Sequence, residues 1–221
     1  MKYIIFDSGP LINFAMNGAI PIFKNLKKSF NGKFLITKEV KRETMDYPEK
    51  IKRFELEALQ LESLLNEKVL EMPNLDSSKQ KEFDDKTNEI MNRANSTFFA
   101  NGKNIHIIDK GEAEALALSA ILKETNVIVI DERTTRMLCE NPENLRKLME
   151  IKLHTRITAN KNNYEFFKGF TIIRSTELAY IAAKKKLIDL KDPRVLEAML
   201  YAMKFKGCSV SDQEIEVIKR L

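Results

Sequence analysis

The sequence predicts an α/β protein, a three-layer α/β/α sandwich with a central parallel sheet. Short apolar segments rich in β-branched and aromatic residues alternate with longer segments of helical periodicity. Strands joined by helical crossovers are typically parallel, and parallel strands are buried on both faces. The strand-like segments are residues 2–6, 33–36, 127–130 and 170–173. We expect them to form one sheet, with 2–6 and 127–130 side by side or separated by one strand.

Capping residues predict where several helices begin. A polar side chain can accept from an unpaired backbone amide of the first turn, and a proline at the first helical position has no amide hydrogen to leave unpaired. The candidate starts are Ser8 or Gly9 before Pro10, Thr37, Asp109 with Glu112, Ser211 with Glu214, and Asp192 before Pro193. The pairs Asp109/Glu112 and Ser211/Glu214 have the spacing of a capping box.

The chain divides into a core at residues 1–169, with a helical insertion at about 48–104, and a C-terminal helical extension at 170–221 packed on the core. The first part of the insertion, "EKIKRFELEALQLESLLNEKV", has apolar residues at helical spacing. The part after it is mostly polar. We expect two helices that project from the core and shape access to a site. The apolar face around Phe54, Leu61 and Leu65 needs burial, either on the core or against a second copy in a homodimer.

Composition excludes several classes of protein. No apolar run approaches the roughly 20 residues of a membrane span, and residues 1–7 lack the features of a secretory signal, so we expect a cytoplasmic protein with no membrane partner. The two cysteines, Cys139 and Cys208, are too few and too far apart for a disulfide framework or a zinc knuckle. The formal charge of +5 fits a partner that carries phosphates, but it equally fits a solvated surface.

Two aspartates follow buried strands. Asp7 comes after "YIIF", and Asp131, with Glu132 next to it, comes after "NVIVI". Open α/β sheets bind ligands in crevices outside the carboxyl ends of their strands. The two aspartates are therefore expected to share one crevice.

Two further acids are candidates for the same crevice. The helix "KGEAEALALSAI" is apolar nearly all round, so a carboxylate within it costs desolvation energy unless it is paired. Glu112 is explained as the capping-box partner of Asp109, whereas Glu114 has no such explanation; we favour Glu114 and keep Glu112 as the alternative. In "FLITKEVKRET", Glu43 is on the side of a helix that should face the sheet, although a solvated glutamate is the other interpretation.

Carboxylates that converge without a cation repel one another and raise their pKa values. A divalent metal removes that repulsion, and oxygen ligands suit Mg²⁺ or Mn²⁺. A metal-bound water can attack a phosphodiester. We therefore predict a metal site of Asp7, Glu43, Glu114 and Asp131, with Glu112 and Glu132 as further candidate ligands.

Four segments resemble, in order, the motifs of PIN-domain nucleases, especially the archaeal and bacterial relatives of VapC-type toxins. They are "IIFDSGPLINFA", "FLITKEVKRE", "DKGEAEALALS" and "NVIVIDERTTR". The resemblance covers residues 1–46 and 105–140, with a weaker likeness in the helical tail. Glutamate stands where the third family acid is commonly aspartate, and the insertion is long for the small toxins.

The resemblance implies a PIN-like fold and a metal-dependent endoribonuclease. It matches the first family acid to Asp7, with Ser8 as its small hydroxyl neighbour, the second to Glu43, the third to Glu114 or Glu112, and the fourth to Asp131 or the adjacent Glu132. It implies RNA as substrate and an antitoxin-like protein as partner. The candidate substrate-binding residues are Ser8, Lys38, Arg42, Lys110, Arg133 and Arg136.

Two other functions fit parts of the sequence. A non-catalytic version of the fold would serve as an RNA-binding scaffold, and loss of the acids would mark it, yet all four positions carry carboxylates. A metal-dependent phosphatase of the haloacid-dehalogenase class also begins with a strand that ends in aspartate. That class needs a second aspartate two residues later, where this chain has Gly9.

Overall fold

The main sheet has four parallel strands in the order β2-β1-β5-β7. The computed structural model describes residues 2–221. The strands are β1 (Tyr3–Phe6), β2 (Lys33–Ile36), β5 (Asn126–Val129) and β7 (Ile172–Ile173). Tyr3 of β1 is in register with Lys33 on one side and Asn126 on the other. The prediction that the first strand and the 127–130 strand are neighbours is confirmed.

Side chains of these strands alternate between two hydrophobic cores. Phe6 and Val129 belong to the first core, and Ile5 and Ile128 belong to the second. Both faces of the sheet are therefore apolar, as expected of parallel strands between two helical layers. The α/β class with a parallel sheet is confirmed, and the arrangement is compatible with an α/β/α sandwich.

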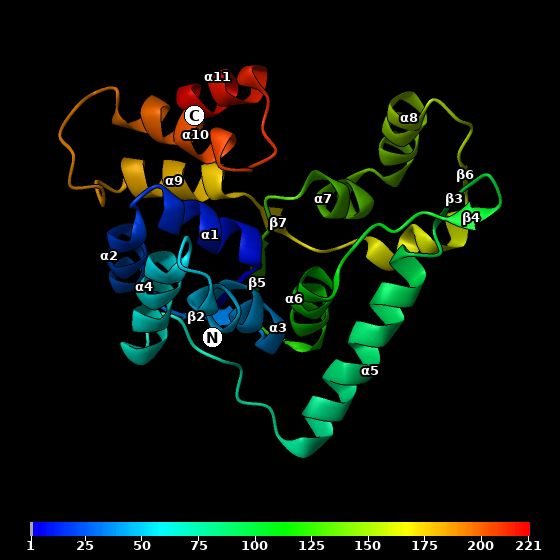
Figure 1. The fold of residues 1–221 in the computed structure, drawn as a ribbon, viewed down its shortest axis with the longest axis horizontal. Coiled ribbons are helices and arrows are strands. Elements are labelled where there is room, and N and C mark those ends of the chain that lie inside the picture. The colour runs from blue at the N-terminus through cyan, green and yellow to red at the C-terminus, as the bar shows by residue number, and fades with distance from the viewer. Residues whose placement is uncertain (1) are drawn as a thin grey trace.

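Helices cover both faces of the sheet (Figure 1). The first core includes side chains from α1 (Ser8–Met16), α2 (Ile20–Ser29), α4 (Glu55–Asn66), α9 (Ser175–Lys184), α10 (Val195–Phe205) and α11 (Asp212–Arg220). The second includes side chains from α5 (Ser77–Ala94), α6 (Lys110–Ile121), α7 (Arg133–Glu140) and α8 (Pro142–Leu153). The short helix α3 (Lys38–Lys41) continues directly into a π-helical turn, Arg42–Asp46.

Residues 48–104 contribute to both cores. Leu61 of α4 is buried in the first core and Leu65 packs against it, so this apolar face is covered within the chain. Phe83 and Ile90 of α5 are buried in the second core. Figure 1 shows α5 running obliquely beside α6, with its first turn farthest from the small sheet. The segment therefore helps to build the body of the protein.

A second, three-stranded antiparallel sheet in the order β4-β3-β6 was not predicted. Its strands are β3 (Phe98–Ala100), β4 (Lys103–Asn104) and β6 (Thr158–Ala159). β3 and β4 form a hairpin through Asn101 and Gly102, which both have positive φ angles. Strands of two or three residues are too short to give an alternating pattern in the sequence.

The C-terminal residues are tied to the sheet and to the first core. The Ile130 amide donates to the Ile173 carbonyl, and Leu178 and Ile215 are buried in the first core. The predicted capping boxes at Asp109/Glu112 and Ser211/Glu214 are confirmed. Within residues 2–221, none of the helices combines the length and the apolar character that a bilayer span requires.

The chain leaves β1 and β5 toward opposite faces of the sheet. α1, which follows β1, packs in the first core, whereas α7, which follows β5, packs in the second. Adjacent strands whose following helices diverge in this way form a topological switch point, and α/β proteins bind ligands in the crevice at such a point. Asp7 directly follows β1, and Asp131 is the second residue after β5.

Candidate functional site

Asp7 has a buried carboxylate with an unpartnered oxygen. It lies at the N-cap of α1, and its amide donates to the Val129 carbonyl at 3.1 Å. The side chain is buried, and Oδ1 has no hydrogen-bond partner. Burial and, to a smaller extent, the charges of Glu112 and Glu43 raise the pKa of Asp7, the backbone amides of Ser8 and Gly9 lower it, and the net result is a pKa of about 8. A carboxylate held in this way needs either a proton or a cation.

The carboxylates of Glu43 and Asp7 both lie close to Gly111. A Cβ built on Gly111 would lie 3.1 Å from Glu43 Oε2 and 3.6 Å from Asp7 Oδ1. Because glycine has no side chain, the two carboxylates can approach the first turn of α6 from the same side. Burial raises the pKa of Glu43, and its interaction with the Ser8 side chain lowers it. Glu43 belongs to the π-helical turn, a feature frequent at functional sites.

Glu112 is the third acid near Asp7. Its Oε2 accepts from the Asp109 amide at 2.8 Å, and its Oε1 accepts from the Thr135 hydroxyl of α7. Burial raises the pKa of Glu112 to about 7, while the bonds from Thr135 and Asp109 lower it. Its capping-box role, expected from the sequence, is confirmed, and the same side chain also stands close enough to Asp7 to raise that residue's pKa.

Glu114 has a different neighbourhood. Its Oε2 accepts from the Glu39 amide at 3.0 Å, at the start of α3, and its Oε1 lies 3.7 Å from Lys110 Nζ. The expectation that Glu114 lacks a structural partner is wrong, because an acceptor at the N-terminus of α3 satisfies an orphan backbone donor. Our preference for Glu114 over Glu112 rested on that expectation.

Asp131 directs its carboxylate toward α1 and the start of α9. Oδ1 accepts from the Ser175 amide at 2.7 Å, and Oδ2 accepts from Asn13 Nδ2 at 3.1 Å. A Cβ on Gly9 would lie 3.7 Å from Asp131 Cβ and 3.8 Å from Asp7 Oδ2. The two aspartates are therefore close, as the sequence predicted, although Asp131 already has two hydrogen bonds. Glu132 caps α7 through bonds from the Thr134 amide and hydroxyl.

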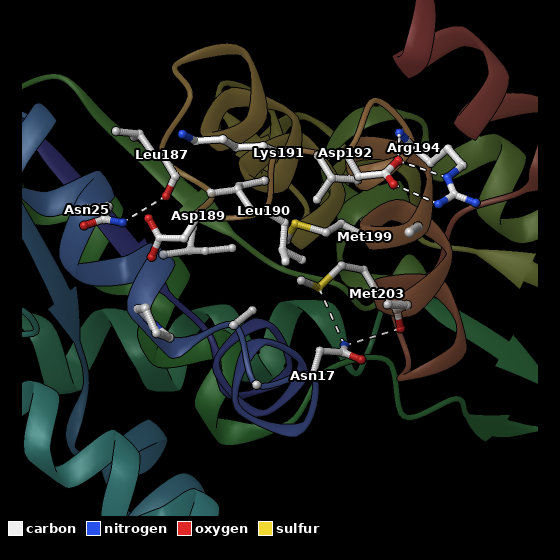
Figure 2. Close-up of a pocket in the computed structure, with 18 residues that line it drawn as sticks. Asn17, Asn25, Leu187, Asp189, Leu190, Lys191, Asp192, Arg194, Met199 and Met203 are labelled. Carbon is white, nitrogen blue, oxygen red and sulfur yellow. Dashed lines mark hydrogen bonds and ion pairs between the residues drawn. The ribbon is translucent and has the colours of Figure 1, made fainter.

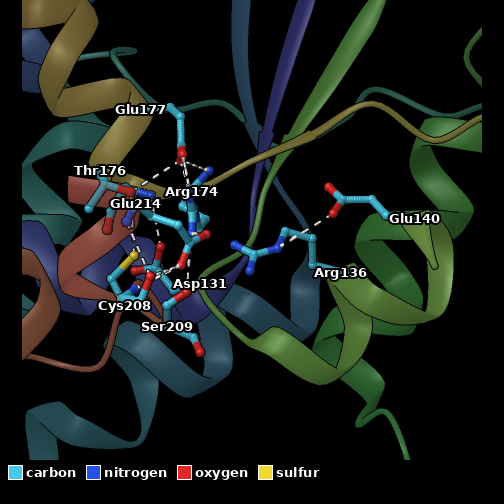
Figure 3. Close-up of polar contacts among 11 residues, drawn as sticks. Asp131, Arg136, Glu140, Arg174, Thr176, Glu177, Cys208, Ser209 and Glu214 are labelled. Atoms are coloured by element: carbon cyan, nitrogen blue, oxygen red, sulfur yellow. Dashed lines mark hydrogen bonds and ion pairs between the residues drawn. The ribbon is translucent and has the colours of Figure 1, made fainter. Parts of the chain in front are cut away.

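Arg174, just before α9, fixes the elements around Asp131 (Figure 3). Its guanidinium donates to Glu177 at 3.0 Å, to Glu214 at 2.6 Å and to the Ser209 carbonyl at 3.3 Å. Burial raises the pKa of Glu214, but bonds from the Ser211 amide and from Arg174 more than offset this effect and hold the pKa at about 2. The network joins the starts of α9 and α11 at the edge of the crevice.

The predicted substrate-binding residues fall into three groups. Arg42 and Lys110 face the Glu39/Glu114 pair, with Arg42 Nε 2.9 Å and Lys110 Nζ 3.6 Å from Glu39 oxygens. Arg136 points toward the Arg174 network and has a 3.8 Å ion pair with Glu140 (Figure 3). The remaining three, Ser8, Lys38 and Arg133, lie respectively at the start of α1, exposed on α3 and at the start of α7.

The chemistry of these acids fits a hard divalent cation, although they do not form a finished site. Among residues 2–221, no group of three or more His, Cys, Asp or Glu side chains has an arrangement that could hold a metal ion. The unpartnered Asp7 oxygen, with Glu43 and Glu112 nearby, nevertheless supplies oxygen ligands of the kind that Mg²⁺ and Mn²⁺ take. Their raised pKa values reflect burial first and repulsion from neighbouring acids second, and a bound cation would offset both effects.

The chain has no match among family models, curated proteins or solved structures. Its chemistry is therefore inferred from its own residues.

Figure 2 shows a cavity of about 940 Å³, and none of these acids lines it. It is bounded by the turn between α1 and α2, the segment 187–194 and helix α10. Its labelled amides already have partners: Asn25 donates to the Leu187 carbonyl and Asn17 to the Ala202 carbonyl. Because none of the candidate acids lines this cavity, it does not contribute to the site at the sheet edge.

Several residues of the site were missed by sequence reasoning. Gly111 and Thr135 adjoin the acids, and Asn13 and Ser175 hold the Asp131 carboxylate. The glycine directly before Glu112, at the start of a buried helix, was the one available signal, because glycine weakens a helix unless a close approach requires it. The partners of Asp131 lie 118 and 44 residues away in the chain and leave no local pattern.

Proposed function

We propose that this protein is a divalent-metal-dependent nuclease of PIN-like fold that hydrolyses phosphodiester bonds, with RNA as substrate. The observation that carries the proposal is the buried Asp7 carboxylate, whose Oδ1 has no partner and which lies beside Glu43 and Glu112 at the sheet edge. A buried acid of this kind costs stability in the free protein, and bound Mg²⁺ or Mn²⁺ would offset that cost.

Each acid has its own role in this proposal. Asp7 and Glu43 would hold the cation across Gly111, and Glu112 would complete the set from the start of α6. When bound, the cation supplies a water of lowered pKa and stabilises charge that develops on the phosphate. In the metal-free protein burial raises the pKa of Glu112 to about 7, and a cation held by this carboxylate would favour its deprotonated form. The Asp131 carboxylate orients α1 through Asn13.

Glu114 takes a structural role in this proposal, and Glu112 takes the place of the third family acid. The reason is the Glu39 amide, which occupies Glu114 Oε2, together with the position of Glu112 beside Asp7. A toxin role with an antitoxin partner stays a prediction of the family resemblance.

A test combines thermal melting with cleavage. The parent protein is melted with and without Mg²⁺ or Mn²⁺, and single-stranded RNA, structured RNA and DNA are offered as substrates. The proposal predicts a metal-induced rise in melting temperature and metal-dependent cleavage of RNA, both lost in Asp7→Asn. Equal melting shifts and equal cleavage in parent and variant would exclude Asp7 as the centre of the reaction.

A non-catalytic RNA-binding scaffold is the second candidate. It is favoured by the finding that, across residues 2–221, no three side chains of the ligand type are already arranged around a metal position. RNA binding without cleavage under any metal condition, with the parent protein correctly folded, would support the scaffold and exclude the nuclease.

A further inference from the structure

A second concavity adjoins the acids of the proposed site. It has a volume of about 480 Å³ and lies between residues 105–107, the start of α7, helix α8 and Ser209. Thr134 lines one wall, and the hydroxyl of the next residue, Thr135, donates to Glu112. His106 also lines the pocket and pairs with Asp109, whose amide donates to Glu112. The pocket is therefore adjacent to Glu112 through two of its lining segments.

The walls of this pocket are amphipathic. Leu145, Leu148 and Ile107 provide apolar surface, and the exposed His106 ring provides a planar face. Ser209 and Thr134 add hydroxyl groups. A volume of this size is typical of pockets that take small organic groups, and here polar and apolar residues line the pocket in equal number.

The charged side chains that line the pocket determine which kind of ligand it can bind. Arg133 and Lys152 line the pocket, and neither makes an ion pair within the part of the chain that the structure describes. Glu132, the one acid that lines the pocket, accepts from the Thr134 amide and hydroxyl and keeps its negative charge. Two basic residues and one acid therefore line the pocket, and the excess of positive charge complements a phosphate.

We propose that this pocket binds one nucleoside of single-stranded RNA next to the carboxylates, with Arg133 and Lys152 on the flanking phosphates. An apolar wall beside a histidine ring suits an unstacked base, and bases are free to leave the stack in single strands. The inference rests on the proposed function only for the identity of the substrate. In this proposal, RNA recognition depends on a base that is unstacked from its neighbours and lies next to the phosphodiester that is cleaved.

Binding without metal tests the pocket separately from cleavage. A fluorescein-labelled single-stranded RNA octamer is titrated in EDTA with the parent protein, with Leu148→Trp, which fills the pocket, and with Ile151→Trp. Ile151 is on the same helix, is 70% exposed and does not line the pocket, so it is the matched control. We expect Leu148→Trp to weaken binding about tenfold or more and Ile151→Trp to bind as the parent does.

The salt dependence of the same titration tests the phosphate contacts. The double variant Arg133→Gln/Lys152→Gln should reduce the slope of log affinity against log salt by about 1.4, since each contact to a single strand contributes about 0.7. An unchanged slope would remove both residues from the RNA contact.

The outcomes separate the pocket from the nuclease proposal. Parent-like RNA binding by Leu148→Trp, or no binding of RNA by the parent, overturns the pocket whether or not RNA is cleaved. Weakened binding by Leu148→Trp supports the pocket even if no cleavage occurs, in which case the nuclease proposal fails. Should Leu148→Trp not fold, photocrosslinking of the parent to RNA containing 4-thiouridine decides: crosslinks in 105–107 or 145–153 support the pocket, and crosslinks confined elsewhere overturn it.

Discussion

Asp7 and Glu43 present carboxylate oxygens to one point above Gly111, at 3.6 Å and 3.1 Å from the position that a Cβ there would occupy. The two acids come from the ends of neighbouring strands, through α1 and through the π-helical turn. This meeting of two acids over a glycine is the basis of the predictions that follow.

Replacement of Asp7 by asparagine should separate stability from activity. The amide removes a buried group whose pKa is raised to about 8, so the metal-free variant should be more stable than the parent at pH 8. Cleavage of RNA should fall by about 100-fold or more. Loss of a residue that only supports a metal ligand costs up to about 100-fold in activity, and loss of a ligand itself should cost at least as much. Melting temperatures at pH 8 and cleavage rates with Mg²⁺ measure the two effects, and lower stability of the variant would contradict the first.

The stability of the metal-free protein should decrease as pH rises from about 4 to about 8. In this window folded Asp7 retains a proton that the unfolded chain has lost, so the folded state binds more protons and becomes less stable with rising pH. Each unit of pKa difference corresponds to about 1.36 kcal/mol, so the loss should reach the order of a few kcal/mol. Urea unfolding at several pH values in EDTA measures it. The decrease should be smaller in Asp7→Asn, and the raised pKa values of Glu112 and Glu43 should account for the part that remains.

Gly111→Ala should lower the rate of RNA cleavage without lowering the melting temperature of the protein. An alanine in a helix is favoured over glycine by about 1 kcal/mol, but its Cβ would lie 3.1 Å from Glu43 Oε2, closer than an ordinary contact. We expect the carboxylates to be displaced and cleavage to fall about tenfold or more. Loss of activity with an unchanged or higher melting temperature is the expected result. Parent-like cleavage would show that the two acids do not act across this glycine.

Glu112→Gln and Glu114→Gln should have different effects. Glutamine keeps the capping-box bond at position 112, so that variant should fold normally but lose the metal-induced stabilisation and cleavage. At position 114 the bond from the Glu39 amide loses its charge assistance, which should cost about 1 kcal/mol of stability while cleavage stays within about threefold. The reverse pattern would restore Glu114 as the site residue.

Removal of the Arg174 side chain should destabilise the protein strongly. Arg174→Met leaves Glu177 and Glu214 without their shared partner, and a broken buried network costs roughly 2–4 kcal/mol. The matched control is Arg194→Met, since Arg194 pairs with Asp192 at an exposed position, and exposed pairs contribute little to stability. Urea unfolding of both variants tests the difference.

The sequence predicted the main sheet well because its strands carry their own signal. Continuous apolar runs such as "YIIF" and "VIVI" indicate strands buried on both faces, and the acids after them mark the sheet edge. The closeness of Asp7 and Asp131 at that edge followed from the predicted sheet topology alone. Strands β3, β4 and β6 escaped because two or three residues show no periodicity.

The choice between Glu112 and Glu114 could not be made from the sequence. Both lie within one turn of the same buried helix, and helical periodicity does not show which neighbour each side chain reaches. Glu114 is explained by an amide of α3, 75 residues earlier in the chain. Glu112 combines a cap with a contact to Thr135, 23 residues later. Such long-range partners are fixed by tertiary packing and leave no local pattern.

The bonds of Asp131 also affect the order of events during folding. Its side chain accepts from Asn13 and from the Ser175 amide, and its carbonyl accepts from the Ser209 amide. These partners are far from Asp131 in the sequence, and contacts between distant segments form slowly because a long loop has to be closed first. The surroundings of Asp131 therefore reach their final arrangement only after residues 13, 175 and 209 have all packed against the end of β5.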